Sequence, residues 1–141
     1  MTTVPGASSQ AASRRLKRQR QRDTKPELAL RRELHRRGLR YRIEMPVVDR
    51  RRRHDIVFSS AKVVVDVRGC FWHGCPDHGT LPKANAEWWR AKLAANRERD
   101  LDTESRLSEA GWSFIVVWEH DEPVATADLV ESTVHHRLDT R

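Results

Sequence analysis

The feature that most constrains the fold is a β-branched run followed at once by a loop rich in metal ligands. The run Lys62-Val63-Val64-Val65-Asp66-Val67 is typical of a buried strand, and it carries a single carboxylate. The ten residues 69–78, Gly-Cys-Phe-Trp-His-Gly-Cys-Pro-Asp-His, supply two thiols, two imidazoles and two aromatic rings. Because such a loop has few aliphatic side chains with which to build a core, we expect a metal ion to hold it against the end of a sheet.

Length and cysteine content narrow the class of protein. The chain has 141 residues and two cysteines, which predicts one domain. Its apolar runs are too short to span a membrane, and no apolar segment precedes the first predicted helix, so we expect no secretory signal. Two cysteines in such a chain favour metal binding in a reducing cytoplasm over a disulfide.

Positive charge is concentrated in two clusters. The first contains Arg14, Arg15, Lys17, Arg18, Arg20 and Arg22, and the second is Arg50–Arg53. The net charge is +7, and these ten of the 27 Lys and Arg residues leave fewer basic side chains elsewhere than the 20 acidic ones. Basic clusters on a slightly acidic body are typical of a protein that binds a polyanion such as nucleic acid. The alternative is a solubilising tail and a solvated loop.

The N-terminal cluster lies in a segment with little else. Residues 1–13 are small and polar, so we predict a flexible basic arm over residues 1–22 and a single domain over residues 23–141.

Local patterns predict the elements of that domain. Thr24 and Glu27 form the start of a helix, and Gly38 ends it. Strands are expected over 41–45, 55–58, 63–67 and 112–118, the last inside the sheet because it is so apolar. A long helix is expected over about 84–110, and Val130, Val134 and Leu138 form the stripe of a final helix. The order predicts an α/β fold with a mixed sheet flanked by helices.

Four residues are candidate zinc ligands. Cys70, Cys75 and His78 lie on one loop, and zinc needs four ligands in a tetrahedron. His120 follows the strand 112–118, and a parallel neighbour would place it near the end of the strand 63–67. We expect a closed, structural Cys2His2 site. The alternative is that the cysteines are small buried residues and the histidines are surface residues.

Two acids and one histidine are candidate catalytic residues. Asp55 begins one strand, and Asp66 lies near the end of the next, which is similar to the core of restriction endonucleases. In that core an Asp and a Glu-x-Lys triplet hold Mg²⁺, and Asp66-Val67-Arg68 has the same charge pattern. His73 could serve as general base. Alternatively, Asp55 is a turn residue and Asp66 is paired with an arginine.

The aromatic side chains offer a route to mispaired DNA. Phe71 and Trp72 lie on a glycine-flanked loop and cannot both face the core. An apolar wedge between base pairs unstacks them at least cost where pairing is weak. Of Trp88 and Trp89, at the start of the long helix, one is expected in the core and Trp89 nearer the DNA; the alternative for all these rings is packing in the core.

An ordered series of motifs is similar to the very-short-patch-repair (Vsr) family of DNA mismatch endonucleases. The resemblance runs from about residue 14 to residue 122. Its landmarks are Arg22-Asp23-Thr24 with Glu27, Gly38-Leu39-Arg40-Tyr41-Arg42, His54-Asp55-Ile56-Val57-Phe58, Gly69–His78, Leu81-Pro82-Lys83, Glu87-Trp88-Trp89, Asn96-Arg97-Glu98-Arg99-Asp100, Gly111-Trp112 and Val117-Trp118-Glu119-His120.

The resemblance implies a Mg²⁺-dependent nickase that cuts 5′ to the T of a T·G mismatch left when 5-methylcytosine deaminates. It implies that Asp55 binds the metal with a backbone contact from Val67, and that His73 and an N-terminal acid, Glu27, act in catalysis. The resemblance also implies that Cys70, Cys75, His78 and His120 bind zinc. It implies that Phe71, Trp72 and Trp89 intercalate into the DNA. The arm would bind the DNA through basic residues, which are Arg14, Arg15, Lys17, Arg18 and Arg22.

The same resemblance implies partners and setting: duplex DNA with a T·G mismatch, a functional link to a cytosine-5 methyltransferase, and no membrane. We expect a monomer in the bacterial cytoplasm, at the nucleoid. The chain departs from the family at His54, which replaces a proline, and at the charged Asp66 and Arg68. Whether Asp66 or the Val67 backbone contacts Mg²⁺, and whether Glu27 is catalytic or only a helix cap, stays open.

Two other functions fit the sequence. One is a restriction or defence nuclease of the same fold that attacks modified DNA, and the other is a non-catalytic, zinc-stabilised DNA-binding module.

Overall fold

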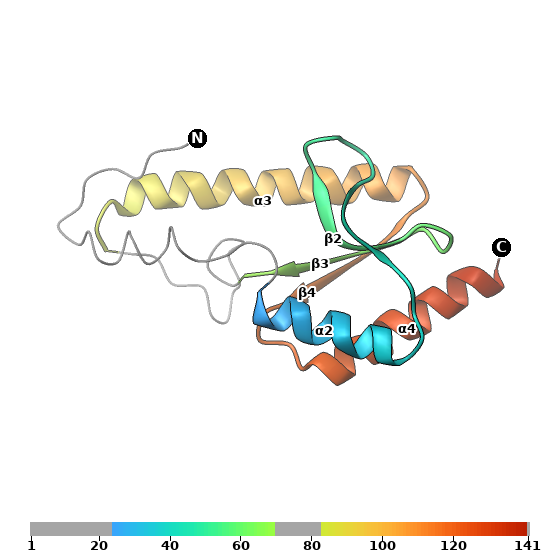
Figure 1. Ribbon diagram of the computed structural model, residues 1–141. Coiled ribbons are helices and arrows are strands. Elements are labelled where there is room, and N and C mark those ends of the chain that lie inside the picture. Colours follow the sequence, from blue (N-terminus) through green and yellow to red (C-terminus); the bar gives the residue numbers. More distant parts are fainter. Residues whose placement is uncertain (1–23, 70–82, 141) are drawn as a thin grey trace.

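The computed structural model describes residues 24–69 and 83–140 of the chain. The elements follow the predicted order of helix, three strands, helix, strand and helix (Figure 1). They are α2 (Lys25–Arg36), β1 (Arg42–Pro46), β2 (Arg53–Phe58), β3 (Val63–Arg68), α3 (Ala86–Glu109), β4 (Ser113–Trp118) and α4 (Pro123–Asp139). A mixed α/β fold is therefore confirmed.

The four strands form one sheet in the order β1-β2-β3-β4. β1 and β3 each pair antiparallel with β2, and β4 pairs parallel with β3. In this parallel pair Val63 lies opposite Ser113 and Arg68 opposite Trp118. The parallel pairing brings the carboxyl ends of β3 and β4 to the same end of the sheet.

The position of β4 corrects one prediction. Among the described residues β4 pairs only with β3, so it lies at an edge of the sheet instead of inside it. The strand is apolar because both of its faces are covered: Val117 belongs to the core shared with α2 and α4, and Phe114 packs beside Leu107 of α3. Burial on two faces produces the continuous apolar run without a neighbour at each edge.

Helices cover both faces of the sheet (Figure 1). α2 and α4 lie on one face, where Leu30 and Leu34 meet Val130 and Val134 over the strand residues of the larger core. α3 crosses the other face, where Leu107 packs with Val57 and Val64. The final stripe is only partly as predicted: Val130 and Val134 are buried, whereas Leu138 is 40% exposed.

The ends of α2 follow from its sequence. Thr24 is the N-cap, and its Oγ1 accepts a hydrogen bond from the Glu27 N–H at 3.4 Å. Gly38 has φ +84°, a left-handed conformation that favours glycine, just after the helix ends. Both features are as predicted. None of the helices within residues 24–69 and 83–140 combines the length and apolarity needed to cross a bilayer.

Candidate active site

The ladder between β2 and β3 changes character at Asp55. Ile56 pairs with Val65 in the regular ladder. Beyond that pair, side-chain carboxylates accept hydrogen bonds from the backbone of the opposite strand. The Asp55 N–H donates to Asp66 Oδ1 at 3.0 Å, and the Val67 N–H donates to Asp55 Oδ2 at 2.7 Å. Each acid therefore holds the backbone of the opposite strand, and the two carboxyl groups are fixed side by side at the end of the hairpin.

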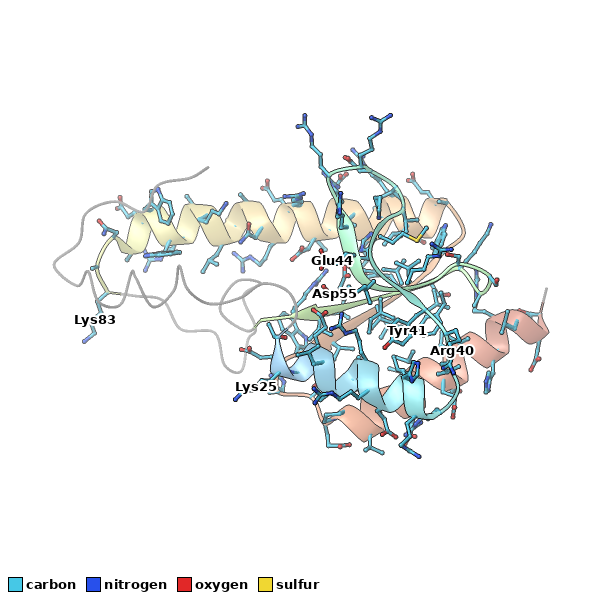
Figure 2. All side chains as sticks on the ribbon, in the orientation of Figure 1. Lys25, Arg40, Tyr41, Glu44, Asp55 and Lys83 are labelled. Atoms are coloured by element: carbon cyan, nitrogen blue, oxygen red, sulfur yellow. The ribbon has the colours of Figure 1, made fainter. Side chains whose placement is uncertain are left out.

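Side-chain alternation breaks at the same point. The Glu27 carboxyl of α2 lies within hydrogen-bonding reach of Asp55, and Ile56 packs in the core beneath α2 and α4. Asp55 and Ile56 therefore face the same side, where a regular strand would alternate. Figure 2 shows Asp55 between the sheet and α2. Glu27 is 1% exposed and forms an ion pair with Arg31 at 3.3 Å.

The distortion extends to the neighbouring strand. In the β1–β2 register Ile43 pairs with Ile56 and Met45 with His54, which leaves Glu44 beside Asp55. Glu44 has φ +55°, a left-handed conformation that is strained for any residue other than glycine. Strain of this kind persists where the surrounding structure requires it, and it gathers at functional sites.

His54 is a site residue that sequence reasoning identified only as a departure from the family. Its Nδ1 lies 2.9 Å from Asp66 Oδ2, and its ring is 2% exposed. The ring stacks edge-on against Phe114, with centroids 6.3 Å apart. Asp66 thus pairs with a histidine from the adjacent strand, and not with an arginine as the alternative reading had it. No pattern in the sequence signals this pair, because it depends on the broken alternation at Asp55.

Burial makes the charge of Asp55 costly. Loss of water, together with the nearby Asp66 and Glu27 carboxyls, raises the pKa of Asp55 to about 8, against the lowering effect of the Val67 N–H. Two carboxylates on facing strands repel each other when both are ionised. The site therefore favours either a proton or a cation at Asp55.

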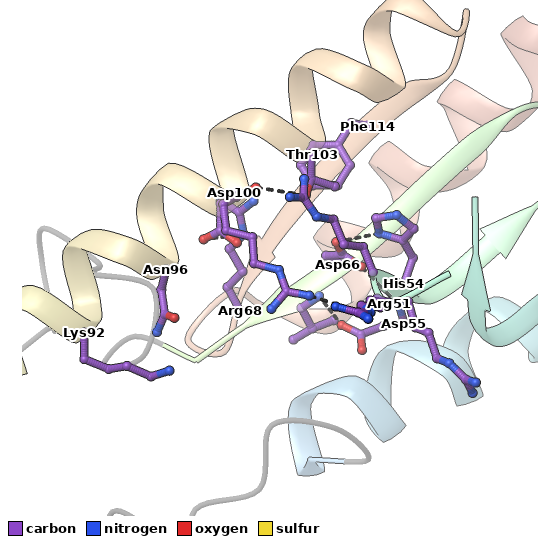
Figure 3. Close-up of a pocket in the computed structure, with 14 residues that line it drawn as sticks. Arg51, His54, Asp55, Asp66, Arg68, Lys92, Asn96, Asp100, Thr103 and Phe114 are labelled. Carbon is purple, nitrogen blue, oxygen red and sulfur yellow. Dashed lines mark hydrogen bonds and ion pairs between the residues drawn. The ribbon is translucent and has the colours of Figure 1, made fainter. Parts of the chain in front are cut away.

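A basic cavity of about 300 Å³ opens in front of these acids. Asp55, Asp66 and Val67 contribute to it from the strands, whereas Lys92, Asn96, Arg99 and Thr103 line it from one side of α3. Arg51, Arg53 and Arg68 add further positive charge. Figure 3 shows the labelled strand and helix residues facing each other across this space. The acids of this cavity suit a metal ion, and the cations that line it with them suit a phosphate group.

Comparison with known proteins identifies the family. The model of the family DNA mismatch endonuclease Vsr matches residues 8–77. The chain is 42% identical over 137 residues to the type II nicking enzyme V.NaeI of Lentzea aerocolonigenes, covering 95% of this chain and 82% of that protein. The chain belongs to the Vsr family. It is a DNA endonuclease by this membership.

Other relatives agree. The type II nicking enzyme V.XorIIP of Xanthomonas oryzae pv. oryzae is 43% identical over 101 residues, which cover 71% of this chain and 73% of the relative. The DNA mismatch endonuclease Vsr of Escherichia coli K12 is 37% identical over 101 residues, which cover 70% of this chain and 62% of that enzyme.

The donor atoms near Asp55 fit a Vsr-type magnesium site. Mg²⁺ is usually held by one or two carboxylates, with water and substrate phosphate completing its shell. Asp55 supplies one carboxylate, and Val67 presents its backbone to β2, because its N–H and carbonyl lie on the same edge of β3. Within residues 24–69 and 83–140 no three His, Cys, Asp or Glu side chains come together as a ready metal cage.

One of the four predicted zinc ligands lies within the described residues. His120 lies just past β4, and its Nε2 is 3.7 Å from Asp121 Oδ1. The preceding residue, Glu119, donates its N–H to the Arg68 carbonyl at 3.0 Å. His120 thus lies where β3 ends and the chain continues to Cys70, as the expected parallel pairing requires.

Several predicted site residues lie outside the described residues. They are Arg14, Arg15, Lys17, Arg18 and Arg22 of the arm, the zinc ligands Cys70, Cys75 and His78, the catalytic candidate His73, and the aromatic pair Phe71 and Trp72.

The two adjacent tryptophans at the start of α3 differ in burial. Trp89 is 1% exposed, whereas Trp88 is only partly buried. The two rings meet edge-on with centroids 4.7 Å apart. Successive helix residues point about 100° apart, so one ring of the pair faces inward, as predicted. That ring is Trp89, and the expected approach of Trp89 to DNA stays a prediction.

The raised pKa of Asp55 leads to a prediction for stability. Because the folded pKa of about 8 exceeds the ordinary value of 3.8, the folded state favours the protonated carboxyl, and stability is lost as pH rises from about 4 to 8. Asp55→Asn cannot ionise and keeps an oxygen that can accept from Val67. Without added magnesium, we expect Asp55→Asn to melt several degrees above the wild type at pH 8, measured by circular dichroism.

The same comparison at pH 4 is the control. Both proteins then carry an uncharged side chain at this position in the folded state, so the two melting temperatures should converge. A gap of equal size at pH 4 and pH 8 would contradict the assigned environment of Asp55.

Proposed function

We propose that this chain is a Mg²⁺-dependent endonuclease that nicks one strand of duplex DNA 5′ to the T of a T·G mismatch. The observation that carries the proposal is the pairing of the buried Asp55 carboxylate with the Val67 backbone at the base of a basic cavity. The names of its relatives, a DNA mismatch endonuclease and several type II nicking enzymes, support nicking and mismatched DNA.

Each acid has a distinct part in this proposal. Asp55 and the Val67 carbonyl would hold Mg²⁺, and the bound ion would supply charge neutralisation at the scissile phosphate and a lowered pKa for an attacking water. Asp66 acts as a positioning residue, because its two oxygens already accept from the Asp55 N–H and face His54. Glu27 supports Asp55 from α2, and its backbone N–H donates to the N-cap residue Thr24 of that helix. His73 is the general base.

The remaining expectations stay part of the proposal. A Zn²⁺ ion bound by Cys70, Cys75, His78 and His120 is structural. Phe71 and Trp72 wedge beside the mismatch, and the arm over residues 1–22 grips the duplex. The protein works as a monomer at the nucleoid, and it repairs the deamination product of a cytosine-5 methyltransferase.

Strand-specific nicking tests this function. Duplexes that are identical except for a T·G or a T·A pair are labelled on each strand and incubated with protein and Mg²⁺. We expect one nick, 5′ to the mismatched T, and at least about a hundredfold slower cleavage of the T·A duplex, the difference that a few kcal/mol of unstacking cost would produce.

The other functions give different results in the same assay. Four further relatives are named type II nicking enzymes, which favours a second candidate tied to restriction systems. Cleavage that depends on cytosine methylation but not on the mismatch would select that candidate. Tight binding without any cleavage would select the zinc-stabilised DNA-binding module and overturn the nuclease.

A further inference from the structure

The arginine loop, residues 47–53, connects β1 to β2 and includes Arg53, the first residue of β2. It is held against α3 by its own backbone and by one of its arginines. Arg52 Nη1 bonds to Asp102 Oδ2 and lies 3.0 Å from Thr103 Oγ1. Arg99 of α3 donates to the Arg51 carbonyl at 3.1 Å. A backbone carbonyl and the side chain of the next residue are thus both tied to α3, which fixes the conformation of the loop next to Asp55.

Charge around this attachment is balanced. The acids here are Asp49 and Asp102, and each of them forms ion pairs with both Arg52 and Arg106. Arg106 Nε lies 3.0 Å from Asp102 Oδ2, and Arg106 Nη1 lies 3.9 Å from Asp49 Oδ2. The hydrogen bond from Arg52 lowers the pKa of Asp102, which keeps that carboxylate ionised. The two acids therefore form their ion pairs in this part of the structure with Arg52 and Arg106.

Three arginines of the loop keep uncompensated charge. Arg50, Arg51 and Arg53 are exposed, and their side chains form no hydrogen bond or ion pair with any residue in the described part of the chain. Arg51 and Arg53 line the cavity that contains Asp55 and Asp66, whereas Arg50 does not. Figure 3 labels Arg51 among the residues that line this cavity. Within the four-arginine run, Arg52 therefore holds the loop to α3, Arg51 and Arg53 line the cavity, and Arg50 lies outside it.

We propose that Arg51 and Arg53 form a backbone clamp that binds phosphates of the DNA strand flanking the scissile bond. A guanidinium matches the fork of two phosphate oxygens, and a loop already fastened to α3 loses little further entropy when the phosphate binds. This inference rests on the proposed function for the position of the scissile phosphate, and it adds a DNA contact from the Arg50–Arg53 run.

Salt dependence of binding tests the clamp, with Arg50→Ala as the matched control. The wild type, Arg51→Ala, Arg53→Ala and Arg50→Ala are titrated onto one matched duplex at several salt concentrations, without added magnesium. Each cavity variant should reduce the slope of log K against log salt by about one and weaken binding about tenfold at low salt. Arg50→Ala removes the same charge from the same loop and should leave the slope unchanged.

The outcomes separate the clamp from the function. Equal slopes for all four proteins, or an equal loss in Arg50→Ala, overturn the clamp while nicking by the wild type still supports the proposed function. If the wild type does not nick a T·G duplex, the function fails, yet reduced slopes in the two cavity variants alone still support a phosphate clamp. Unchanged melting temperatures of the variants confirm that the effect is not unfolding.

Discussion

Replacement of Asp55 by alanine is expected to lower the nicking rate on a T·G duplex by about a thousandfold or more. A bound magnesium ion contributes several kcal/mol of transition-state stabilisation, and each 1.4 kcal/mol is a factor of about ten in rate. Asp55 is the carboxylate whose environment most favours a cation, since burial and two neighbouring acids raise its pKa. Removal of the side chain removes the ligand and leaves the basic cavity in place.

DNA binding should respond differently from nicking. The cations lining the cavity come from the arginine loop, Arg68 and α3, and they do not depend on Asp55 for their position. The dissociation constant for the duplex should therefore change by less than about threefold, and in the direction of tighter binding, because one negative charge near the phosphate is lost. Gel-shift titration and single-turnover nicking, carried out on the same preparation, measure the two quantities.

A matched control removes a carboxylate elsewhere. Glu104 is exposed on α3 and lines no part of the cavity. Glu104→Ala should nick at the wild-type rate. Full activity in Asp55→Ala would show that the metal lies elsewhere, and equal loss in both variants would trace the effect to net charge and not to ligation.

Local patterns in the sequence were sufficient for most elements of the fold. The helix at Thr24 and the three strands before residue 69 depend on caps, glycines and β-branched runs, each of which acts within a few residues. The edge position of β4 could not be predicted in the same way. An apolar strand shows that both faces are covered, but its neighbours in the sheet are set by contacts with residues far away in the chain.

The site divides along the same line. Asp55 is identifiable because an acid at the start of a buried strand is unusual, and Glu27 because it forms part of a helix cap. The His54–Asp66 pair depends on Asp55 and Ile56 facing the same side of the sheet. The alternating pattern of a regular strand does not predict that arrangement. The four consecutive arginines likewise look equivalent in the sequence, and only the contacts of Arg52 with α3 show that it has a different task.

The double variant Cys70→Ala, Cys75→Ala is expected to lose one zinc ion per chain and most of its folding stability. Zinc sites of this kind contribute on the order of 10 kcal/mol, which is comparable with the whole stability of a domain, about 5–15 kcal/mol. The described backbone supports a link of this kind, since Glu119 is bonded to Arg68 and places His120 where the chain leaves β3 for Cys70.

Metal analysis and thermal melting of three proteins decide the matter. The cysteine variant should contain no zinc and melt far below the wild type, whereas His135→Ala, which removes an exposed histidine of α4, should keep both zinc and stability. Asp55→Ala should also keep its zinc, because the proposed magnesium and zinc sites share no ligand. Retention of one zinc ion by the cysteine variant would contradict the ligand set, and loss of zinc from Asp55→Ala would show that the two metal sites are one.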